Sequence, residues 1–187
     1  DRGARARDTS GRLSELEACH GLCLVDDAVF VSAAGRKHIC VLSASSLKLL
    51  YTFGSSVLME PMDLDVYYPL PAAGGTARPP PLLYVTDRER HRVDLFSTSG
   101  DHVSSFGGEG TAPGSFKEPL GVAVRKQRVY VTEGLGARLQ VLEPNGTPLL
   151  VLPAPTGGRL VGLAWHESRL YVSEIEAHRI HVFKIID

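Results

Sequence analysis

The sequence lacks both a long apolar run and an excess of one charge. No apolar stretch in the 187 residues approaches the roughly 18 residues that a membrane span needs. The 20 Lys and Arg nearly balance 21 Asp and Glu, for a formal net charge of −1. That balance argues against a strongly electrostatic nucleic-acid binder. Aromatic residues make up only 7%, but 43% of the chain is hydrophobic, so the composition predicts a globular chain rather than a disordered one.

Cysteine is scarce, and its placement excludes a disulfide framework. The chain has an odd number of cysteines, Cys19, Cys23 and Cys40, and it lacks the second Cys or His pair of a zinc finger. We interpret them as reduced packing residues, which favours a reducing, cytoplasmic compartment. Residues 1–8 hold three arginines and no signal-peptide apolar region. Since residue 1 is Asp, we expect the native start to be missing and residues 1–18 to form an N-terminal tail.

What the chain has in excess is glycine and proline, with 31 residues, or about 17%, against an ordinary share of roughly 12%. Four segments between these turn residues share the pattern aromatic-Val-Ser/Thr, at 30–32, 84–86, 130–132 and 171–173. Eight residues after each Val, a second stretch with alternating apolar residues begins, at Ile39, Val93, Leu139 and Ile180. Alternation of period two predicts half-buried strands, and the constant offset predicts one hairpin used four times.

Each repeat also has a strand before this hairpin, and three repeats have a strand after it. Three preceding strands open with glycine, at Gly21, Gly121 and Gly162, and the second repeat has Asp63-Leu64-Asp65-Val66 there instead. The Val anchors are 54, 46 and 41 residues apart, and a Pro/Gly-rich insertion at 68–81 accounts for the longest spacing. Four-stranded units of about 40–45 residues predict an all-β fold, a β-propeller with four visible antiparallel blades over residues 19–187.

These repeats resemble NHL repeats. The third is the closest, with Gly114-Ser115-Phe116 and Glu118-Pro119-Leu120-Gly121-Val122, then Tyr130-Val131-Thr132-Glu133 and Arg138-Leu139-Gln140-Val141. The second and fourth repeats match from 83 to 108 and from 160 to 183, and the first is degenerate. The resemblance implies a ring of about six blades. With four visible, we expect a partial or shortened ring, completed by missing residues, by another chain, or by a closing strand at Ser10–Leu16.

An acidic residue follows the anchor in three repeats, and an arginine lies five residues later. The expected charge pairs are Asp87 with Arg92, Glu133 with Arg138, and Glu174 with Arg179. The first repeat lacks both members, so they are present or absent together, as expected for an ion pair across the hairpin turn. We assign these pairs a structural role.

The hairpin turns and the loops before the inner strands should share one end of the propeller. Their basic residues are the candidate partner-binding face: Arg36, Lys37, His38, Arg88, Arg90, His91, Lys117 and His178. Acidic residues interrupt this set, and no aromatic residue stands ready to stack on bases. A mixed-charge face of this kind favours a protein partner.

The remaining polar residues do not form a catalytic or metal-binding pattern. His20 alone does not make a zinc site, and we expect no cofactor and no metal. Asp63 and Asp65 are the only acids on the inner strands. Asn145-Gly146-Thr147 matches a glycosylation sequon, but Asn-Gly also suits a tight turn. We therefore expect a non-catalytic protein-interaction scaffold within a larger assembly. A propeller that binds single-stranded RNA and a lyase or hydrolase with a central-channel site are the alternatives.

Overall fold

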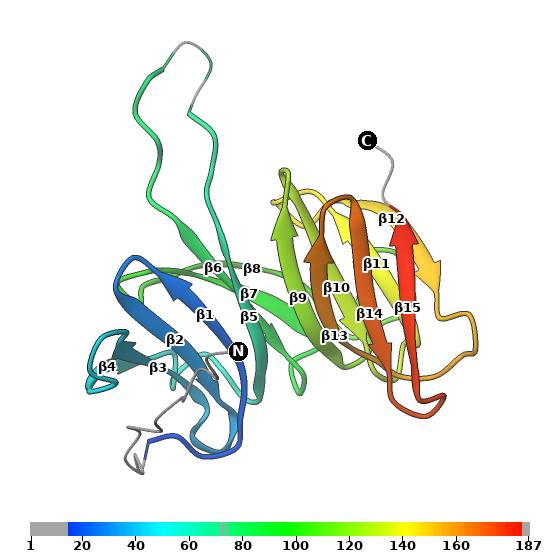
Figure 1. Ribbon diagram of the computed structural model, residues 1–187, viewed down its shortest axis with the longest axis horizontal. Coiled ribbons are helices and arrows are strands. Elements are labelled where there is room, and N and C mark those ends of the chain that lie inside the picture. The colour runs from blue at the N-terminus through cyan, green and yellow to red at the C-terminus, as the bar shows by residue number, and fades with distance from the viewer. Residues whose placement is uncertain (1–14, 72, 74, 185–187) are drawn as a thin grey trace, which may run out of the picture.

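The computed structural model describes residues 15–71, 73 and 75–184, and it is a four-bladed β-propeller (Figure 1). Apart from a short 3-10 turn at Ala34–Arg36, its regular elements are strands. Each sheet is an antiparallel meander in which strands follow one another in chain order. The predicted all-β propeller is confirmed. No helix among the described residues has the length and hydrophobicity to cross a membrane.

The first two blades have four strands each. Blade 1 contains β1 (Cys19–Val25), β2 (Ala28–Ala33), β3 (His38–Ser43) and β4 (Leu49–Phe53). Blade 2 contains β5 (Pro61–Tyr67), β6 (Leu82–Asp87), β7 (Arg92–Ser97) and β8 (His102–Gly107). The first strand of each blade lies innermost, and the others follow outwards.

Blade 3 contains β9 (Pro119–Arg125), β10 (Arg128–Glu133), β11 (Arg138–Leu142) and β12 (Pro148–Pro153). Blade 4 has three strands among the described residues: β13 (Leu160–His166), β14 (Arg169–Glu174) and β15 (Arg179–Lys184). The aromatic-Val-Ser/Thr segments of the sequence form the second strand of every blade, and the second apolar stretches form the third.

The hydrophobic core consists of separate layers between successive blades, because each sheet is apolar on both faces. Between blades 2 and 3, for example, Tyr84 and Val93 pack against Val122 and Phe116. Equivalent layers join blades 1 and 2 and blades 3 and 4. We call the side of a blade that meets the next blade in the chain its forward face, and the opposite side its backward face.

The inner strands approach one another closely at the glycines that open them. A Cβ atom at Gly121 would lie 2.2 Å from the carbonyl oxygen of Val161 in blade 4, so only glycine fits there. In blades 1 to 3, the hydroxyl of the anchor segment donates a hydrogen bond to a carbonyl on the inner strand of the next blade. These contacts join Ser32 to Met62 (2.7 Å), Thr86 to Leu120 (2.8 Å) and Thr132 to Val161 (2.7 Å). Successive blades are therefore linked at the channel wall.

The insertion at 68–81 connects β5 to β6 and projects well beyond the blades (Figure 1). Its described residues form no strand, as the proline and glycine content predicts. Tyr67 and Leu82, at its base, are direct cross-strand partners. We call residues 68–81 the arm.

Most of the predicted closing strand, Ser10–Leu16, lies outside the described residues. Leu16 packs against the backward face of blade 1, with Val31 and Leu42. The carbonyls of Glu17 and Ala18 accept hydrogen bonds from the amides of the β2–β3 turn. Whether the tail supplies a strand to blade 4 stays a prediction.

Candidate functional site

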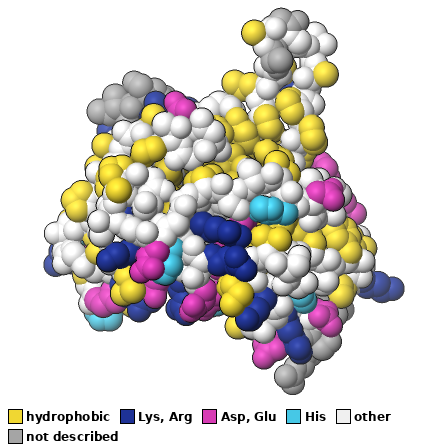
Figure 2. All heavy atoms as spheres, turned by 180° about the vertical axis from the view of Figure 1, so that it is seen from behind, with side chains coloured by type: hydrophobic (Ala, Val, Ile, Leu, Met, Phe, Trp, Pro, Cys, Tyr) yellow, Lys and Arg dark blue, Asp and Glu magenta, His cyan; other side chains and the backbone are white. Residues whose placement is uncertain are grey.

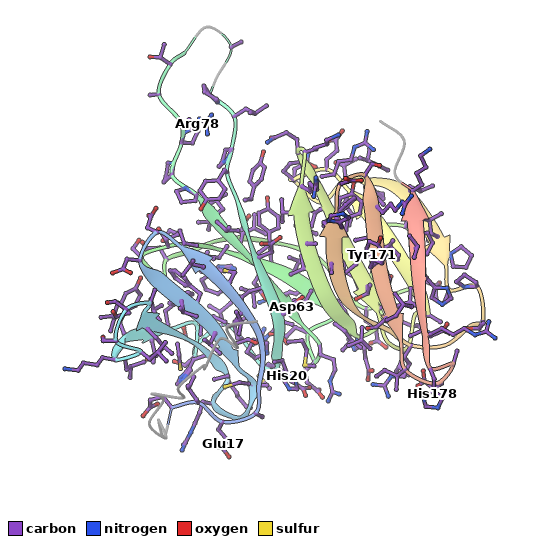
Figure 3. The ribbon with its side chains drawn as sticks, in the orientation of Figure 1. Glu17, His20, Asp63, Arg78, Tyr171 and His178 are labelled. Carbon is purple, nitrogen blue, oxygen red and sulfur yellow. The ribbon has the colours of Figure 1, made fainter. Side chains whose placement is uncertain are left out.

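The β2–β3, β6–β7, β10–β11 and β14–β15 turns lie at one end of the propeller, which we call the turn face. Figure 3 shows Glu17, His20 and His178 at this end and Arg78, on the arm, at the opposite end. The molecule thus presents two separate candidate binding surfaces. The sequence predicted the first from its basic residues.

Of the three predicted charge pairs, the one in blade 3 is present. Arg138 Nε lies 2.6 Å from Glu133 Oε1, and the Glu133 side chain is fully buried. Glu133 also accepts hydrogen bonds from the Lys117 amide (2.7 Å) and from the Gln140 side chain (2.8 Å). The carboxylate therefore fastens the loop that leads into β9 to the second strand of the blade.

The other two predicted ion pairs do not form in the structure. In blade 2, Arg92 binds Asp94, with Nη2 and Oδ1 2.9 Å apart, while Asp87 accepts hydrogen bonds from the amides of Met59 and Glu60. Asp94 is two residues beyond the arginine, on the same strand, and draws it away from Asp87. Asp87 therefore binds backbone amides instead of the predicted arginine.

In blade 4 a histidine takes the arginine's place. His181 Nε2 lies 2.5 Å from Glu174 Oε2, and Arg179 is exposed. Hydrogen bonds from the Thr156 hydroxyl and from His181 lower the pKa of the Glu174 carboxyl. The residue on the third strand directly opposite the anchor Val of the second strand decides whether the predicted ion pair forms. A neutral Gln140 leaves the predicted pair intact in blade 3.

The predicted basic residues are not equally available for binding. Lys37, Arg90 and His178 are exposed, and Lys117 is half-buried. Arg36 pairs with Glu17 at 3.0 Å and Arg88 with Glu60 at 2.7 Å. These pairs neutralise part of the positive charge of the turn face.

The two other histidines of the predicted face make contacts within the protein. His38 is only 8% exposed, and its Nε2 lies 3.3 Å from the sulfur of Cys40. His91 Nδ1 accepts a hydrogen bond from the Glu118 amide at 3.0 Å. Both side chains serve the fold, so the accessible basic set is smaller than the sequence suggested.

Charges of both signs are intermingled on the surface, together with apolar side chains. Figure 2 shows basic, acidic and histidine side chains side by side on the rear of the molecule. Leu135 and Ile175, in the β10–β11 and β14–β15 turns, are exposed. The sequence analysis did not assign these two residues to a binding face, although an apolar residue in a polar turn can indicate a contact surface. A surface of mixed charge with apolar side chains suits a protein partner.

Residues of the four inner strands line a central cavity of about 340 Å³, among them His20, Met62, Asp63, Leu120 and Val161. The two inner-strand acids are engaged with backbone amides. Asp63 accepts hydrogen bonds from Leu64 (2.9 Å) and Val122 (3.0 Å). Asp65 accepts them from Val66 (2.8 Å) and Val124 (2.7 Å). These acids link blade 2 to blade 3.

Burial governs the ionisation of the groups around this cavity. Desolvation raises the pKa of Asp63 to about 6, although the two amides that donate to it act in the opposite direction. Desolvation and the nearby Asp65 and Asp63 carboxylates raise the pKa of the Cys23 thiol to about 12. Among residues 15–71, 73 and 75–184, no three His, Cys, Asp or Glu side chains gather in a way that could hold a metal ion.

The arm exposes large side chains at the end opposite the turn face. Tyr68 and Leu70 are 50% and 62% exposed, and the stretch Gly75–Pro80, which includes Arg78, is exposed throughout. Tyr67, at the base, donates a hydrogen bond to the side chain of Gln127 in blade 3, and Gln127 Nε2 bonds the Tyr68 carbonyl at 3.5 Å. The base of the arm is therefore fixed to the propeller.

No protein-family model matches the sequence, and no curated protein matches it either. The fold is similar to solved structures. The computationally designed Ika4 protein matches with a TM-score of 0.64 and 14% identity, over 97% of this chain and 99% of that one. The designed Ika8 protein matches with a TM-score of 0.60 and 15% identity, over 90% of this chain and 46% of that one.

Virginiamycin B lyase from Staphylococcus aureus, solved as a catalytically inactive variant with quinupristin, is also similar. Its TM-score is 0.62 and its identity 15%, over 92% of this chain and 57% of the lyase. This chain thus spans about half the length of Ika8 and of the lyase. At these identities the likeness shows the propeller fold alone.

Proposed function

We propose that this chain is an NHL-type propeller that works as a non-catalytic protein-interaction scaffold within a larger assembly. Its repeats carry the NHL-like anchors, and its buried acids hold loops and neighbouring blades. The observation that carries the proposal is the arm, which presents Tyr68, Leu70 and Arg78 to solvent from a fixed base. Tyrosine and arginine are enriched at the centres of protein interfaces.

The two alternatives have less support. An RNA-binding face needs exposed aromatic residues beside its basic ones, and the turn face offers Leu135 and Ile175 with mixed charge. A channel enzyme needs acid and base groups that act together. Both oxygens of Asp63 already accept amide hydrogen bonds, which leaves His20 as the other titratable side chain in the lining of the cavity. The scaffold function accounts for the arm, which neither alternative explains.

The test is a variant in which residues 69–80 are replaced by a short Gly-Ser turn. Because Tyr67 and Leu82 are direct cross-strand partners, such a turn can close the hairpin without disturbing the sheet. We expect an unchanged unfolding transition and the loss of the protein partners that copurify with the natural chain. The comparison variant is Arg88→Glu with Arg90→Glu, which tests the turn face as the rival binding surface and should keep the partners. Retention of every partner by both variants would contradict the proposal.

A further inference from the structure

Blade 4 has a forward face built like those of the other blades, but it is exposed. In blade 3 this face is buried against blade 4, through Ala123, Tyr130, Leu139 and Val141. The corresponding residues of blade 4 are Ala164, Tyr171, Ile180 and Val182, as the strand registers show. Ile180 and Val182 are 63% and 53% exposed. Tyr171 lies on β14, within this sheet (Figure 3).

The polar details of a blade junction are present there too. Ser173 Oγ accepts a hydrogen bond from the Gly162 amide (2.9 Å), as Thr132 does from Gly121. Thr132 also donates to a carbonyl of the next blade, but among the described residues Ser173 has no such acceptor. A Cβ atom at Gly162 would meet only the Ser173 hydroxyl, at 3.2 Å. Gly162 thus keeps open the space that a neighbouring inner strand would occupy.

Blade 1 carries the matching half of such a junction on its backward face. Leu16 lies three residues before β1, as Leu58 and Phe116 lie three residues before β5 and β9. Leu58 and Phe116 are buried between blades, whereas Leu16 packs on blade 1 alone. Leu22 and Leu24, on β1, are 69% and 59% exposed.

The charges of these two faces are complementary at the end of the propeller opposite the turn face. At the junction of blades 2 and 3, Tyr67 at the end of β5 contacts Gln127 in the β9–β10 turn. The equivalent positions are His166 at the end of β13 and Asp27 in the β1–β2 turn. Arg169, beside His166, and Asp26, beside Asp27, are exposed as well. An acidic turn would therefore meet a basic strand end.

We propose that the forward face of blade 4 docks on the backward face of blade 1 of a second copy of this chain, so that two copies close one ring. In that junction, the Ser173 hydroxyl would donate to the His20 carbonyl, in the position of Met62, Leu120 and Val161 in the other junctions. The chain superposes on 46% of Ika8 and 57% of the lyase, so its four blades have the curvature of about half a larger propeller. Head-to-tail contacts of two such halves close a ring.

The test is the mass of the full chain in solution. One chain is 20.2 kDa, and we expect a species of twice that mass by light scattering. Leu22→Asp and Val182→Asp each place a charge in one half of the junction and should give monomers with an unchanged circular dichroism spectrum. Val103→Asp, on β8, is the matched control because Val103 is equally exposed, at 53%, and lies outside both faces. It should stay dimeric.

Mixing the two monomeric variants distinguishes this arrangement from other dimers. A ring of one Leu22→Asp chain and one Val182→Asp chain has one junction without substitutions, so the mixture should recover dimer that neither variant forms alone. A natural chain that stays monomeric at every concentration would overturn the proposal. So would open-ended oligomers, or a dimer that only one of the two substitutions disrupts. Because none of these residues lies in the arm, dimerisation and partner binding can fail independently.

Discussion

The carboxylate of Asp63, on the inner strand of blade 2, accepts a hydrogen bond from the amide of Val122 on the inner strand of blade 3, at 3.0 Å. The equivalent position is glycine in the other three blades, namely Gly21, Gly121 and Gly162. At this position the glycines of the other blades allow the backbones of neighbouring inner strands to approach closely. In blade 2, the Asp63 side chain occupies that space and accepts a hydrogen bond from the next inner strand.

This arrangement makes the stability of the propeller depend on pH through Asp63. Its pKa is raised from 3.8 to about 6, so the folded state holds the proton more tightly than the unfolded state does. The contribution of protonated Asp63 is fully present below about pH 4 and is lost as pH rises through 6. A shift of this size corresponds to roughly 3 kcal/mol.

We expect the free energy of unfolding of the natural chain, relative to Asp63→Asn, to fall between pH 4 and pH 7. Urea unfolding of both proteins across that range measures the difference, and the effects of the other titrating groups largely cancel in it. A difference that stays constant with pH would show that Asp63 titrates normally.

The glycines of the inner strands provide a matched pair of substitutions. Gly121→Ala places a Cβ atom 2.2 Å from the Val161 carbonyl oxygen, so we expect a loss of roughly 1–3 kcal/mol. Gly162→Ala meets only Ser173 within its own chain and should leave the stability of a single chain nearly unchanged. Chemical unfolding of both variants, with Leu22→Asp added to each to keep the chains monomeric, measures the contrast. Equal losses at the two positions would mean that inter-blade approach does not set the requirement for glycine.

The repeats, the four blades and the arm could be predicted because they depend on local patterns: period-two alternation, turn residues and a constant spacing. The pairing of the buried charges could not, because it depends on a side chain across the sheet. Asp94 draws Arg92 away from Asp87, and His181 occupies Glu174. The predicted pair forms where the competing residue is the neutral Gln140. The burial of His38 was missed for the same reason, since it follows from contacts made by other segments.

The Glu133 network should be the most sensitive polar site in blade 3. Glu133→Ala removes the carboxylate partner of Arg138 and the acceptor of the Lys117 backbone amide. It also leaves the Gln140 side chain with the Ser115 carbonyl as its remaining acceptor. Breaking a buried ion pair on one side costs roughly 3–5 kcal/mol. Thermal and urea unfolding measure the loss, with Glu143→Ala, at an exposed turn position, as the control. A loss no larger than that of the control would mean that the network contributes little.

The turn face should not bind RNA. Its cations are partly neutralised by Glu17 and Glu60, and Leu135 and Ile175 cannot stack as aromatic rings do. We expect no saturable binding of mixed-sequence single-stranded RNA, measured by fluorescence anisotropy as a function of salt. Saturable binding that weakens with salt and is abolished by Arg88→Glu with Arg90→Glu would support the RNA-binding alternative instead.

The scaffold function is tested most directly by finding where a partner touches the chain. A photo-crosslinking amino acid at position 70, in place of the exposed Leu70 on the arm, should capture a defined protein in cells. The same amino acid at position 103, in place of the similarly exposed Val103 on β8, should not capture it. Capture of that protein from position 70 alone is the predicted result. The same proteins captured from both positions, or none from position 70, would contradict the assignment of the arm as the binding element.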